Sequence, residues 1–261
     1  MHNLLEQLES LVRRAGDAIL SVRRGAYEVM EKGDQSPVTE ADLAAHRILV
    51  EGLPSLLDVP VLSEETQIPG WSERSQWHKY WLVDPLDGTR EFISGNGEYT
   101  VNVALIEGGE PVLGVVFSPE LNHFYCGAKG YGAYKNGTSI SVRRLGGNVP
   151  TVVVSRHFHS QQIVDLVKSR FDLVDIRQIG SSLKFCLIAE GLADFYPRLG
   201  PTNEWDTAAA QAVLTSAGGA VLSCDGNELR YNQKSEMLNP NFIAIGDQTL
   251  CWMPDLLSQL N

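Results

Sequence analysis

The sequence predicts a layered α/β protein, with an α+β first half and a second half in which strands and helices alternate. Three observations predict this fold class. Apolar residues recur at helical spacing near the N-terminus, short apolar runs separated by glycine turns fill residues 99–142, and strand and helix patterns alternate after Pro150. The 261 residues are enough for one large domain or two closely joined halves.

The first half begins with helical patterns. Leu8, Val12, Ala15 and Ile19 belong to an apolar series whose spacing predicts a long amphipathic helix within residues 3–30. The elements expected next are a polar loop at 32–38, a helix from Thr39 through Leu49, a short strand at 59–62, a polar connection at 66–79 and an apolar strand that ends at Asp84.

Glycine and asparagine turns then divide the chain into hairpins. The expected strands are 99–106, 112–118, 123–127 and 132–142, with turns at Glu107-Gly108-Gly109-Glu110 and Asn136-Gly137. The second half is expected to hold strands at 151–154, 173–179, 220–223 and 242–245, and helices at 160–170, 181–191, 206–217 and from about Asp247. The junction at 146–150 predicts two halves, 1–148 and 149–261, within one compact catalytic unit.

The net charge restricts the class of partner. Twenty-one Lys and Arg residues against 32 Asp and Glu residues give a formal charge of −11. A chain this acidic is not expected to bind a nucleic-acid polymer or an anionic membrane surface in general. If its substrate is a phosphate, bound cations must reverse the local charge.

The cysteines and the N-terminus predict a cytoplasmic protein. The four cysteines are far apart, with no CxxC pair and no zinc spacing, so we expect reduced thiols. Charged residues interrupt the apolar pattern at the N-terminus, and no stretch approaches the ~20 apolar residues of a membrane span. We therefore expect no membrane anchor; peripheral membrane association, and a monomer or a dimer, remain open.

The segment Asp84-Pro85-Leu86-Asp87-Gly88-Thr89 indicates a cation site. Pro85 cannot donate to a sheet and Gly88 relaxes the backbone, so the strand should stop and turn here. Two carboxylates with a backbone carbonyl between them are the oxygen ligands that Mg²⁺ prefers. A plain turn, with Asp87 capping a following helix, explains the same residues equally well.

Other acidic residues occupy similar positions. Glu64 follows a predicted strand, Asp206 precedes a predicted helix, and Asp42 lies three residues after Thr39. Each has a structural explanation: a solvated loop charge for Glu64, a helix N-cap for Asp206, and a capping box for Asp42. Together, however, these acids could bind two or more Mg²⁺ ions, which can activate water and stabilise a leaving oxygen. Free amides after Gly88 could hold a phosphate.

Five segments resemble the motifs of the inositol monophosphatase superfamily, in order and spacing and over essentially the whole chain. They are Lys32, Asp34-Gln35-Ser36-Pro37-Val38-Thr39-Glu40-Ala41-Asp42, Ser63-Glu64-Glu65, the segment from Trp81 to Thr89, and Trp205-Asp206-Thr207-Ala208-Ala209. The resemblance implies an αβαβα sandwich and a Mg²⁺-dependent, Li⁺-sensitive phosphatase with two to three ions.

The resemblance also implies roles for particular residues. Metal ligands would be Glu64, Asp84, the carbonyl of Leu86, Asp87 and Asp206, with Asp84 bridging two ions and Glu64 shared with a weaker third ion. Thr89, paired with Asp42, would orient the nucleophilic water. The carboxylate of Asp42 could serve both its helix cap and Thr89 through different oxygens. Lys32 resembles a loop lysine near the active site.

The second half resembles the branch of 3′(2′),5′-bisphosphate nucleotidases of the CysQ type, which act in sulfur metabolism. The features are Ser155-Arg156-His157, Gly180-Ser181-Ser182-Leu183-Lys184 and Arg198. Lys184 and Arg198 could hold the 5′-phosphate of adenosine 3′,5′-bisphosphate, near Ser155, His157 and Ser181. Structural explanations compete here, because Ser181 is a good helix cap, Lys184 fits a solvated helix charge and His157 fits a surface histidine.

Three hypotheses follow. The first is a nucleotidase that hydrolyses adenosine 3′,5′-bisphosphate, and possibly its 5′-phosphosulfate, with Glu64, Asp87, Gly88, Thr89 and Asp206 also touching substrate. The second is an inositol-1-phosphatase. The third is a metal-dependent nucleotide-binding regulator without catalysis, which the intact set of acids disfavours.

Overall fold

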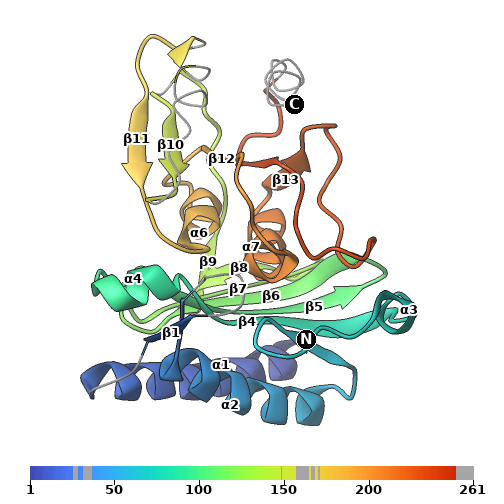
Figure 1. Ribbon diagram of the computed structural model, residues 1–261. Coiled ribbons are helices and arrows are strands. Elements are labelled where there is room, and N and C mark those ends of the chain that lie inside the picture. The colour runs from blue at the N-terminus through green and yellow to red at the C-terminus, as the bar shows by residue number, and fades with distance from the viewer. Residues whose placement is uncertain are drawn as a thin grey trace.

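The computed structural model describes residues 1–25, 29–31, 37–147, 149–156, 165, 168–169 and 171–250. Its described part forms four layers (Figure 1). Helices α1 (His2–Arg24) and α2 (Glu40–Leu56) cover one face of a seven-stranded sheet, and α6 (Leu183–Ala189) and α7 (Glu204–Ser216) lie between that sheet and a five-stranded sheet. The layers agree with the predicted fold class.

The seven-stranded sheet has the order β3-β4-β5-β6-β7-β8-β9, and only the β3–β4 pair is parallel. Its strands are β3 (Val61–Ser63), β4 (Lys79–Asp87), β5 (Thr100–Glu107), β6 (Glu110–Ser118), β7 (His123–Ala128), β8 (Gly132–Lys135) and β9 (Thr138–Ile140). The predicted hairpins are confirmed, with 132–142 forming the two strands of one hairpin. Short helices α3 (Trp71–Arg74) and α4 (Thr89–Ser94) flank β4 in sequence.

The five-stranded sheet has the order β11-β10-β12-β14-β13. Its strands are β10 (Thr151–Val154), β11 (Asp175–Gln178), β12 (Phe195–Arg198), β13 (Ala220–Ser223) and β14 (Phe242–Ile245). Sequence reasoning missed β12, because Pro197 within it argues against a central strand. The structure accommodates this proline because β12 pairs with β10 only at Phe195, so Pro197 lies beyond that pairing.

Several predicted boundaries were wrong. Helix α1 runs from His2 to Arg24, within one residue of the span 3–30 that was expected to contain it, but Val29–Glu31 (β1) pairs with Pro37–Thr39 (β2), so the expected loop at 32–38 ends in a strand. Helix α2 continues past Leu49 to Leu56 despite Pro54 in its last turn. The described residues 246–250 contain a turn rather than the start of a helix. The helix expected at 160–170 falls largely outside the described residues, as does the rest of the last one.

Close packing sets the position of α7 on the large sheet. A Cβ added to Gly114 of β6 would lie 2.1 Å from the carbonyl oxygen of Ala209, and one added to Gly127 of β7 would lie 2.7 Å from the Cα of Val213. These glycines let the helix backbone approach the strands, where any larger residue would push it away. The first turn of α7, which carries Asp206, is therefore held over this sheet.

One hydrophobic core joins the two predicted halves. Tyr80 and Val116 of the large sheet belong to the same buried cluster as Trp205 of α7 and Phe242 of β14. A second cluster lies between the other face of the large sheet and the buried stripes of α1 and α2. The site residues thus stand on elements that pack rigidly from both sides.

Candidate active site

The acidic segment lies at the irregular end of β4. The strand was expected to stop at Asp84, but it runs on to Asp87, and its register with β5 shifts between these two residues. Asp84 is buried, and one of its oxygens, Oδ1, accepts a hydrogen bond of 3.0 Å from the backbone N–H of Leu86. The shift places one extra residue on β4 between Asp84 and Asp87, relative to β5.

Three distant acids meet at this point. One carboxylate oxygen from each of Glu64, Asp84 and Asp206 lies within 4.8 Å of the others. Glu64 is placed by β3, because its N–H donates to the carbonyl of Val83 over 3.1 Å. Parallel pairing of β3 with β4 therefore brings their ends together.

The electrostatics of this acid cluster favour a bound cation. Burial raises the pKa of Asp84 well above its usual value, and the nearby charges of Glu64 and Asp87 raise it further. Burial likewise raises the pKa of Asp206, with Asp87 and Glu64 adding to the effect. Buried carboxylates that lie close together repel one another and disfavour ionisation, and a divalent ion with oxygen ligands would relieve that cost. The donor set therefore fits Mg²⁺.

Asp206 is the third residue of α7 rather than its N-cap. The cap is Asn203, and the carboxylate Oδ2 of Asp206 accepts a 2.9 Å hydrogen bond from the N–H of Asn203, which completes a capping box. The helix thus begins two residues before the predicted start at 206. The spacing Asn203-x-x-Asp206 is the signal that could have shown this.

Asp42 and Thr89 meet as expected. The Oδ2 atom of Asp42 accepts from the N–H and the hydroxyl of Thr39 over 2.7 and 2.6 Å, which caps α2. The Oδ1 atom accepts from the hydroxyl of Thr89 over 3.2 Å. The same hydroxyl lies 3.5 Å from the carbonyl oxygen of Leu86. One carboxylate therefore both caps a helix and binds Thr89.

Gly88 has a left-handed backbone conformation, and its neighbours leave little room for a side chain. Its φ is +93°, and an added Cβ would lie 3.2 Å from the carbonyl oxygen of Glu98 and 3.4 Å from the Cβ of Ser181. This glycine allows the turn before α4 to approach the Gly180-Ser181 turn of the second half closely.

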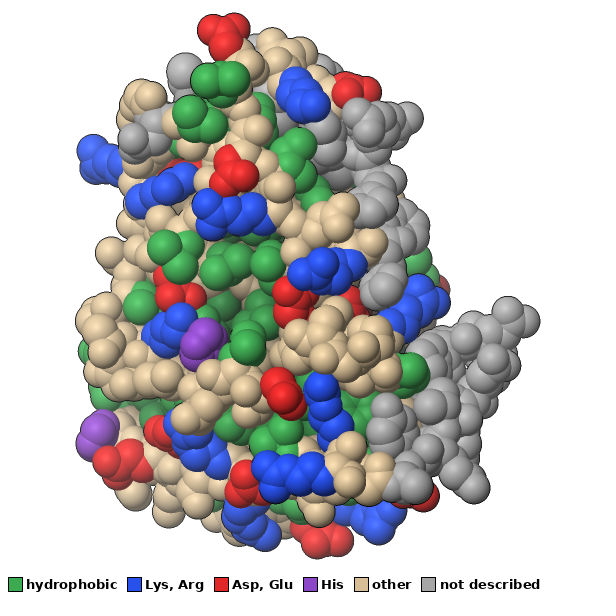
Figure 2. All heavy atoms as spheres, turned by 90° about the vertical axis from the view of Figure 1, so that its left-hand side faces the viewer, with side chains coloured by type: hydrophobic (Ala, Val, Ile, Leu, Met, Phe, Trp, Pro, Cys, Tyr) green, Lys and Arg blue, Asp and Glu red, His purple; other side chains and the backbone are tan. Residues whose placement is uncertain are grey.

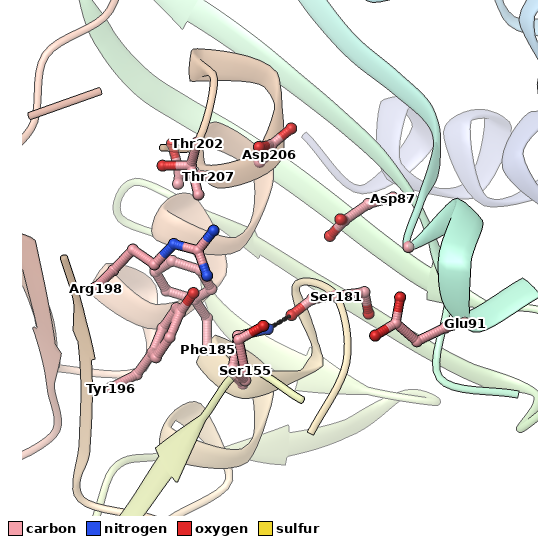
Figure 3. Close-up of a pocket in the computed structure, with 12 residues that line it drawn as sticks. Asp87, Glu91, Ser155, Ser181, Phe185, Tyr196, Arg198, Thr202, Asp206 and Thr207 are labelled. Carbon is pink, nitrogen blue, oxygen red and sulfur yellow. Dashed lines mark hydrogen bonds between the residues drawn. The ribbon is translucent and has the colours of Figure 1, made fainter. Parts of the chain in front are cut away.

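A pocket beside the acid cluster gathers most of the predicted substrate residues (Figure 3). Its volume is about 120 Å³, and Asp87 and Arg198 point into it from opposite sides. The lining residues are Asp87, Gly88, Glu91, Ser155, Ser181, Lys184, Phe185, Tyr196, Arg198, Thr202, Asp206 and Thr207. Lys32 and His157 lie outside the described residues.

Lys184 is not the solvated helix charge that its sequence context suggested. It is buried, and its Nζ donates to the carbonyl oxygens of Ser181 over 2.6 Å and Ile179 over 3.3 Å, while lying 5.0 Å from the centre of the Tyr196 ring. Burial lowers the pKa of Lys184 to about 8, an effect that the charge of Asp87 opposes. Arg198 is fixed by donating to the carbonyls of Gly200 and Pro201 over 3.1 and 2.8 Å.

Ser181 stands one residue before the cap position of α6, yet its hydroxyl accepts a 3.4 Å hydrogen bond from the N–H of Leu183, the first residue of that helix. The cap position belongs to Ser182, and Ser181 has a positive φ of 48°. An ion pair clamps the turn before it, because Arg156 donates two 2.6 Å hydrogen bonds to Glu98, which also accepts from the N–H of Gly180 over 2.7 Å. Sequence reasoning missed Glu98, because no local pattern relates it to residues 58 and 82 positions away.

Sequence reasoning also missed Ser182 and Asn102. The hydroxyl of Ser182 lies 2.9 Å from Oδ2 of Asp87 and 2.8 Å from the carbonyl oxygen of Asp206. Asn102 on β5 donates to Ser182 over 2.9 Å. An asparagine within an apolar strand is the only local signal that the sequence offers for Asn102.

The acidic net charge does not form a single acidic patch on the face that Figure 2 presents. Figure 2 shows cationic and anionic side chains interspersed on the face that it presents, without a large field of one sign. Across the part of the chain that the structure describes, no helix is both long and apolar enough to cross a membrane.

Comparisons with known proteins agree with this geometry. The sequence pattern of the inositol monophosphatase family matches residues 1–249. The 3′(2′),5′-bisphosphate nucleotidase CysQ of Escherichia coli K12 is 48% identical over 244 residues, which covers 92% of this chain and 98% of that protein. The corresponding CysQ of Haemophilus influenzae is 35% identical over 257 residues, covering 96% and 95%.

Solved structures show the same likeness. The crystal structure of CysQ from Bacteroides thetaiotaomicron, a bacterial member of the inositol monophosphatase family, superposes with a TM-score of 0.81 at 36% identity, covering 94% of this chain and 97% of that chain. The inositol monophosphatase of Thermotoga maritima gives a TM-score of 0.80 at 26% identity, covering 100% and 97%.

Proposed function

The chain belongs to the inositol monophosphatase family, and on that premise we propose that it is a metal-dependent 3′(2′),5′-bisphosphate nucleotidase. It removes the 3′-phosphate of adenosine 3′,5′-bisphosphate and leaves AMP. The nucleotidase CysQ relatives at 48% identity support this activity. The single observation in the structure that carries it is a pocket into which Arg198 and Asp87 point from opposite sides (Figure 3), and which Lys184 and Asp206 also line.

Two Mg²⁺ ions, with a weaker third, are the proposed cofactor. The residues that would hold them are Glu64, Asp84, the carbonyl of Leu86, Asp87 and Asp206. When bound, Mg²⁺ would supply positive charge that lowers the pKa of a water and offsets the charge of the phosphate. The cluster of Glu64, Asp84 and Asp206 supports this assignment.

Asp42 and Thr89 hold the nucleophilic water in this proposal. Because the Thr89 hydroxyl gives its proton to Oδ1 of Asp42, its oxygen lone pairs are available to accept a hydrogen bond from water. Buried Asp42 is itself fixed by the cap of α2, so the pair is oriented before substrate arrives. The water then attacks phosphorus in line, and the phosphorus–oxygen bond to the ribose 3′-oxygen breaks. In the overall reaction the water's OH stays on the released phosphate and its other proton ends on the 3′-oxygen, which becomes the 3′-hydroxyl of AMP.

The second phosphate distinguishes a bisphosphate nucleotide from an inositol monophosphate. Arg198 and Lys184 provide the positive charge for the 5′-phosphate, and Ser155 and Ser181 provide hydroxyls in the same pocket. Adenosine 3′-phosphate 5′-phosphosulfate carries anions at both positions too, so it is a second substrate of the same site.

A phosphate-release panel tests the proposal. It compares adenosine 3′,5′-bisphosphate, its phosphosulfate form, inositol 1-phosphate and fructose bisphosphate, each with Mg²⁺, without Mg²⁺ and with added Li⁺. We expect Mg²⁺-dependent release that is fastest for the adenosine compounds. Preference for inositol 1-phosphate would favour the inositol-phosphatase hypothesis, and no release from any compound would favour a binding regulator.

A substitution of Arg198 tests whether this residue binds the 5′-phosphate. Arg198→Gln should raise KM for the adenosine bisphosphate about tenfold or more and leave hydrolysis of inositol 1-phosphate nearly unchanged, because a charged hydrogen bond is lost only with the former. Arg177→Gln is the control, since Arg177 on β11 pairs with Asp175 at an exposed position. Equal losses on both substrates would contradict the assigned role of Arg198.

A further inference from the structure

Ser182 is a buried serine at a helix N-cap, but its hydroxyl does not cap the helix. It is 1% exposed and stands at the N-cap of α6, yet its side chain makes no capping hydrogen bond. Serine at this position ordinarily accepts from an N–H of the first helical turn. The hydroxyl is directed instead toward the acidic centre.

Three structural elements meet at this hydroxyl. Asn102 of β5 donates to it over 2.9 Å. The hydroxyl in turn lies 2.9 Å from Oδ2 of Asp87, at the end of β4, and 2.8 Å from the carbonyl oxygen of Asp206, in the first turn of α7. Ser182 therefore links α6 to both segments that carry the proposed ligands of the second metal.

The proton count favours Asp87 as the acceptor. The Ser182 oxygen accepts the hydrogen bond from Asn102 through a lone pair. Its single proton can then be donated to one of the two acceptors at a time. A carboxylate oxygen is a stronger hydrogen-bond acceptor than a backbone carbonyl oxygen. Asn102 itself lies 3.4 Å from the same Oδ2 atom, so both amide and hydroxyl converge on one oxygen of Asp87.

Because Ser182 and Asn102 both donate to Oδ2, the Oδ1 atom of Asp87 can bind a different partner. Within the described ranges, no hydrogen bond is made to Oδ1 of Asp87, and its carboxylate points into the pocket (Figure 3). Asp84 and Asp206 show the same division, since each gives one oxygen to a backbone N–H. Such partners fix the orientation of a ligand before the metal binds.

We propose that Ser182, with its direction set by Asn102, is a positioning residue that orients Asp87 for divalent-metal binding. This inference rests on the proposed function, because it assumes that Asp87 is a metal ligand. It assigns no chemistry to Ser182 itself, which acts only through Asp87. Asn102 is buried, and its Oδ1 atom has no hydrogen-bond partner among the described residues, which lowers the stability of the fold. Its role in orienting Ser182 and Asp87 would explain why an asparagine stands there despite this cost.

Calorimetric titration of Mg²⁺ into the metal-free protein tests the proposal without any substrate. Ser182→Ala should weaken Mg²⁺ binding about tenfold, the lower end of the range found when a partner of a metal ligand is removed. The kcat measured at saturating Mg²⁺ should stay within about twofold of wild type, because the ligands themselves remain. Ser182→Thr keeps the hydroxyl and should restore the affinity.

A matched control separates this role from loss of a buried hydroxyl in general. Ser118 on β6 is also buried, and its hydroxyl has no hydrogen-bond partner among the described residues. Ser118→Ala should leave Mg²⁺ affinity unchanged. Asn102→Ala should weaken Mg²⁺ binding as Ser182→Ala does, and the double variant should lose less than the product of the two effects, because both act on one oxygen.

Two results would overturn the proposal. One is wild-type Mg²⁺ affinity in both Ser182→Ala and Asn102→Ala, and the other is a fall in kcat at saturating Mg²⁺ with no change in affinity. If Ser182→Ala does not fold, the same titration of Ser182→Cys, a weak donor, and of Asn102→Ala decides. Failure of the proposed nucleotidase activity would appear separately, as wild-type protein that binds Mg²⁺ but releases no phosphate.

Discussion

At the scale of single residues, two carboxylates of the site, those of Asp42 and Asp206, each make two kinds of contact. Asp42 and Asp206 occupy the same position in their capping boxes, three residues after Thr39 and Asn203, and each gives one oxygen to the cap. The other oxygen of Asp42 accepts from Thr89, and an oxygen of Asp206 lies in the acid cluster. A helix cap is thus not an alternative to a functional role, because capping is what holds the acid in place.

Thr89→Ala should lower kcat for adenosine 3′,5′-bisphosphate by about 100-fold, the lower end of the range for loss of proton-transfer assistance, with little change in KM. The reason is that the water would lose the acceptor that Asp42 orients. Thr89→Ser keeps the hydroxyl and should retain most of the activity. Steady-state kinetics at saturating Mg²⁺ measure this, with Thr138→Ala on exposed β9 as control. A Thr89→Ala enzyme as active as Thr89→Ser would refute the assignment.

Lys184 should make nucleotide binding depend on pH. Its pKa is lowered to about 8 by burial, so the ammonium is present below that pH and is lost as pH rises through it. KM for the bisphosphate should therefore rise between about pH 8 and pH 9.5, if bound substrate does not hold the proton. A Lys184→Arg variant stays charged over this range. Its KM should be flat where that of wild type rises, and parallel profiles for the two proteins would contradict the role of Lys184.

At the scale of secondary-structure elements, periodicity and turn chemistry predicted most of the fold. The apolar stripe of α1 and the glycine turns of β5–β9 are local signals, and both were read correctly. Strand β12 could not be predicted, because its proline is tolerated only through the short pairing with β10. The end of β4 was misjudged for a related reason: Pro85 interrupts the register with β5 without ending the strand.

Gly114 and Gly127, on which α7 packs, are a second feature that local sequence patterns do not predict. Gly114→Ala should destabilise the protein by about 1–3 kcal/mol, because the new Cβ would meet the carbonyl oxygen of Ala209 at 2.1 Å. Displacement of α7 would also move Asp206, so Mg²⁺ affinity should fall with stability. Urea denaturation and calorimetric Mg²⁺ titration measure both. Gly147→Ala is the control, since nothing lies within 4 Å of that added Cβ and its φ is not positive. An unchanged Gly114→Ala protein would show that α7 can shift without cost.

At the scale of the whole molecule, the acid cluster joins segments from both predicted halves. Glu64 and Asp84 precede residue 148, and Asp206 follows it. Sequence reasoning predicted these ligands from their places after strands and before a helix, and from the resemblance to a family. It could not predict Ser182 with Asn102, or Glu98 with Arg156, because those contacts arise only when the two sheets enclose α6 and α7.

The cluster also makes the metal-free protein unstable in a pH-dependent way. Folding raises the pKa of Asp84 and Asp206 above their usual value of 3.8, so the folded state binds more protons than the unfolded state. The stability of the metal-free protein should therefore be greatest below that value and should be lost progressively as pH rises from it toward the raised pKa values. Mg²⁺ bound at the proposed site would replace the protons and remove this loss.

The variant Asp84→Asn tests whether the buried carboxylate lowers the stability of the metal-free protein while it supports metal binding. It removes the most buried charge of the cluster, so in EDTA at pH 7.5 its Tm should exceed that of wild type, and it should lose Mg²⁺-dependent activity. Wild type should gain about 2.7 kcal/mol at Mg²⁺ concentrations 100 times Kd, and gain less at pH 5, whereas Asp84→Asn should gain little at either pH. Asp225→Asn, in the turn after β13, is the control. A lower Tm for Asp84→Asn in EDTA would mean that the carboxylate stabilises the fold without metal, and that its burial serves packing rather than a cation.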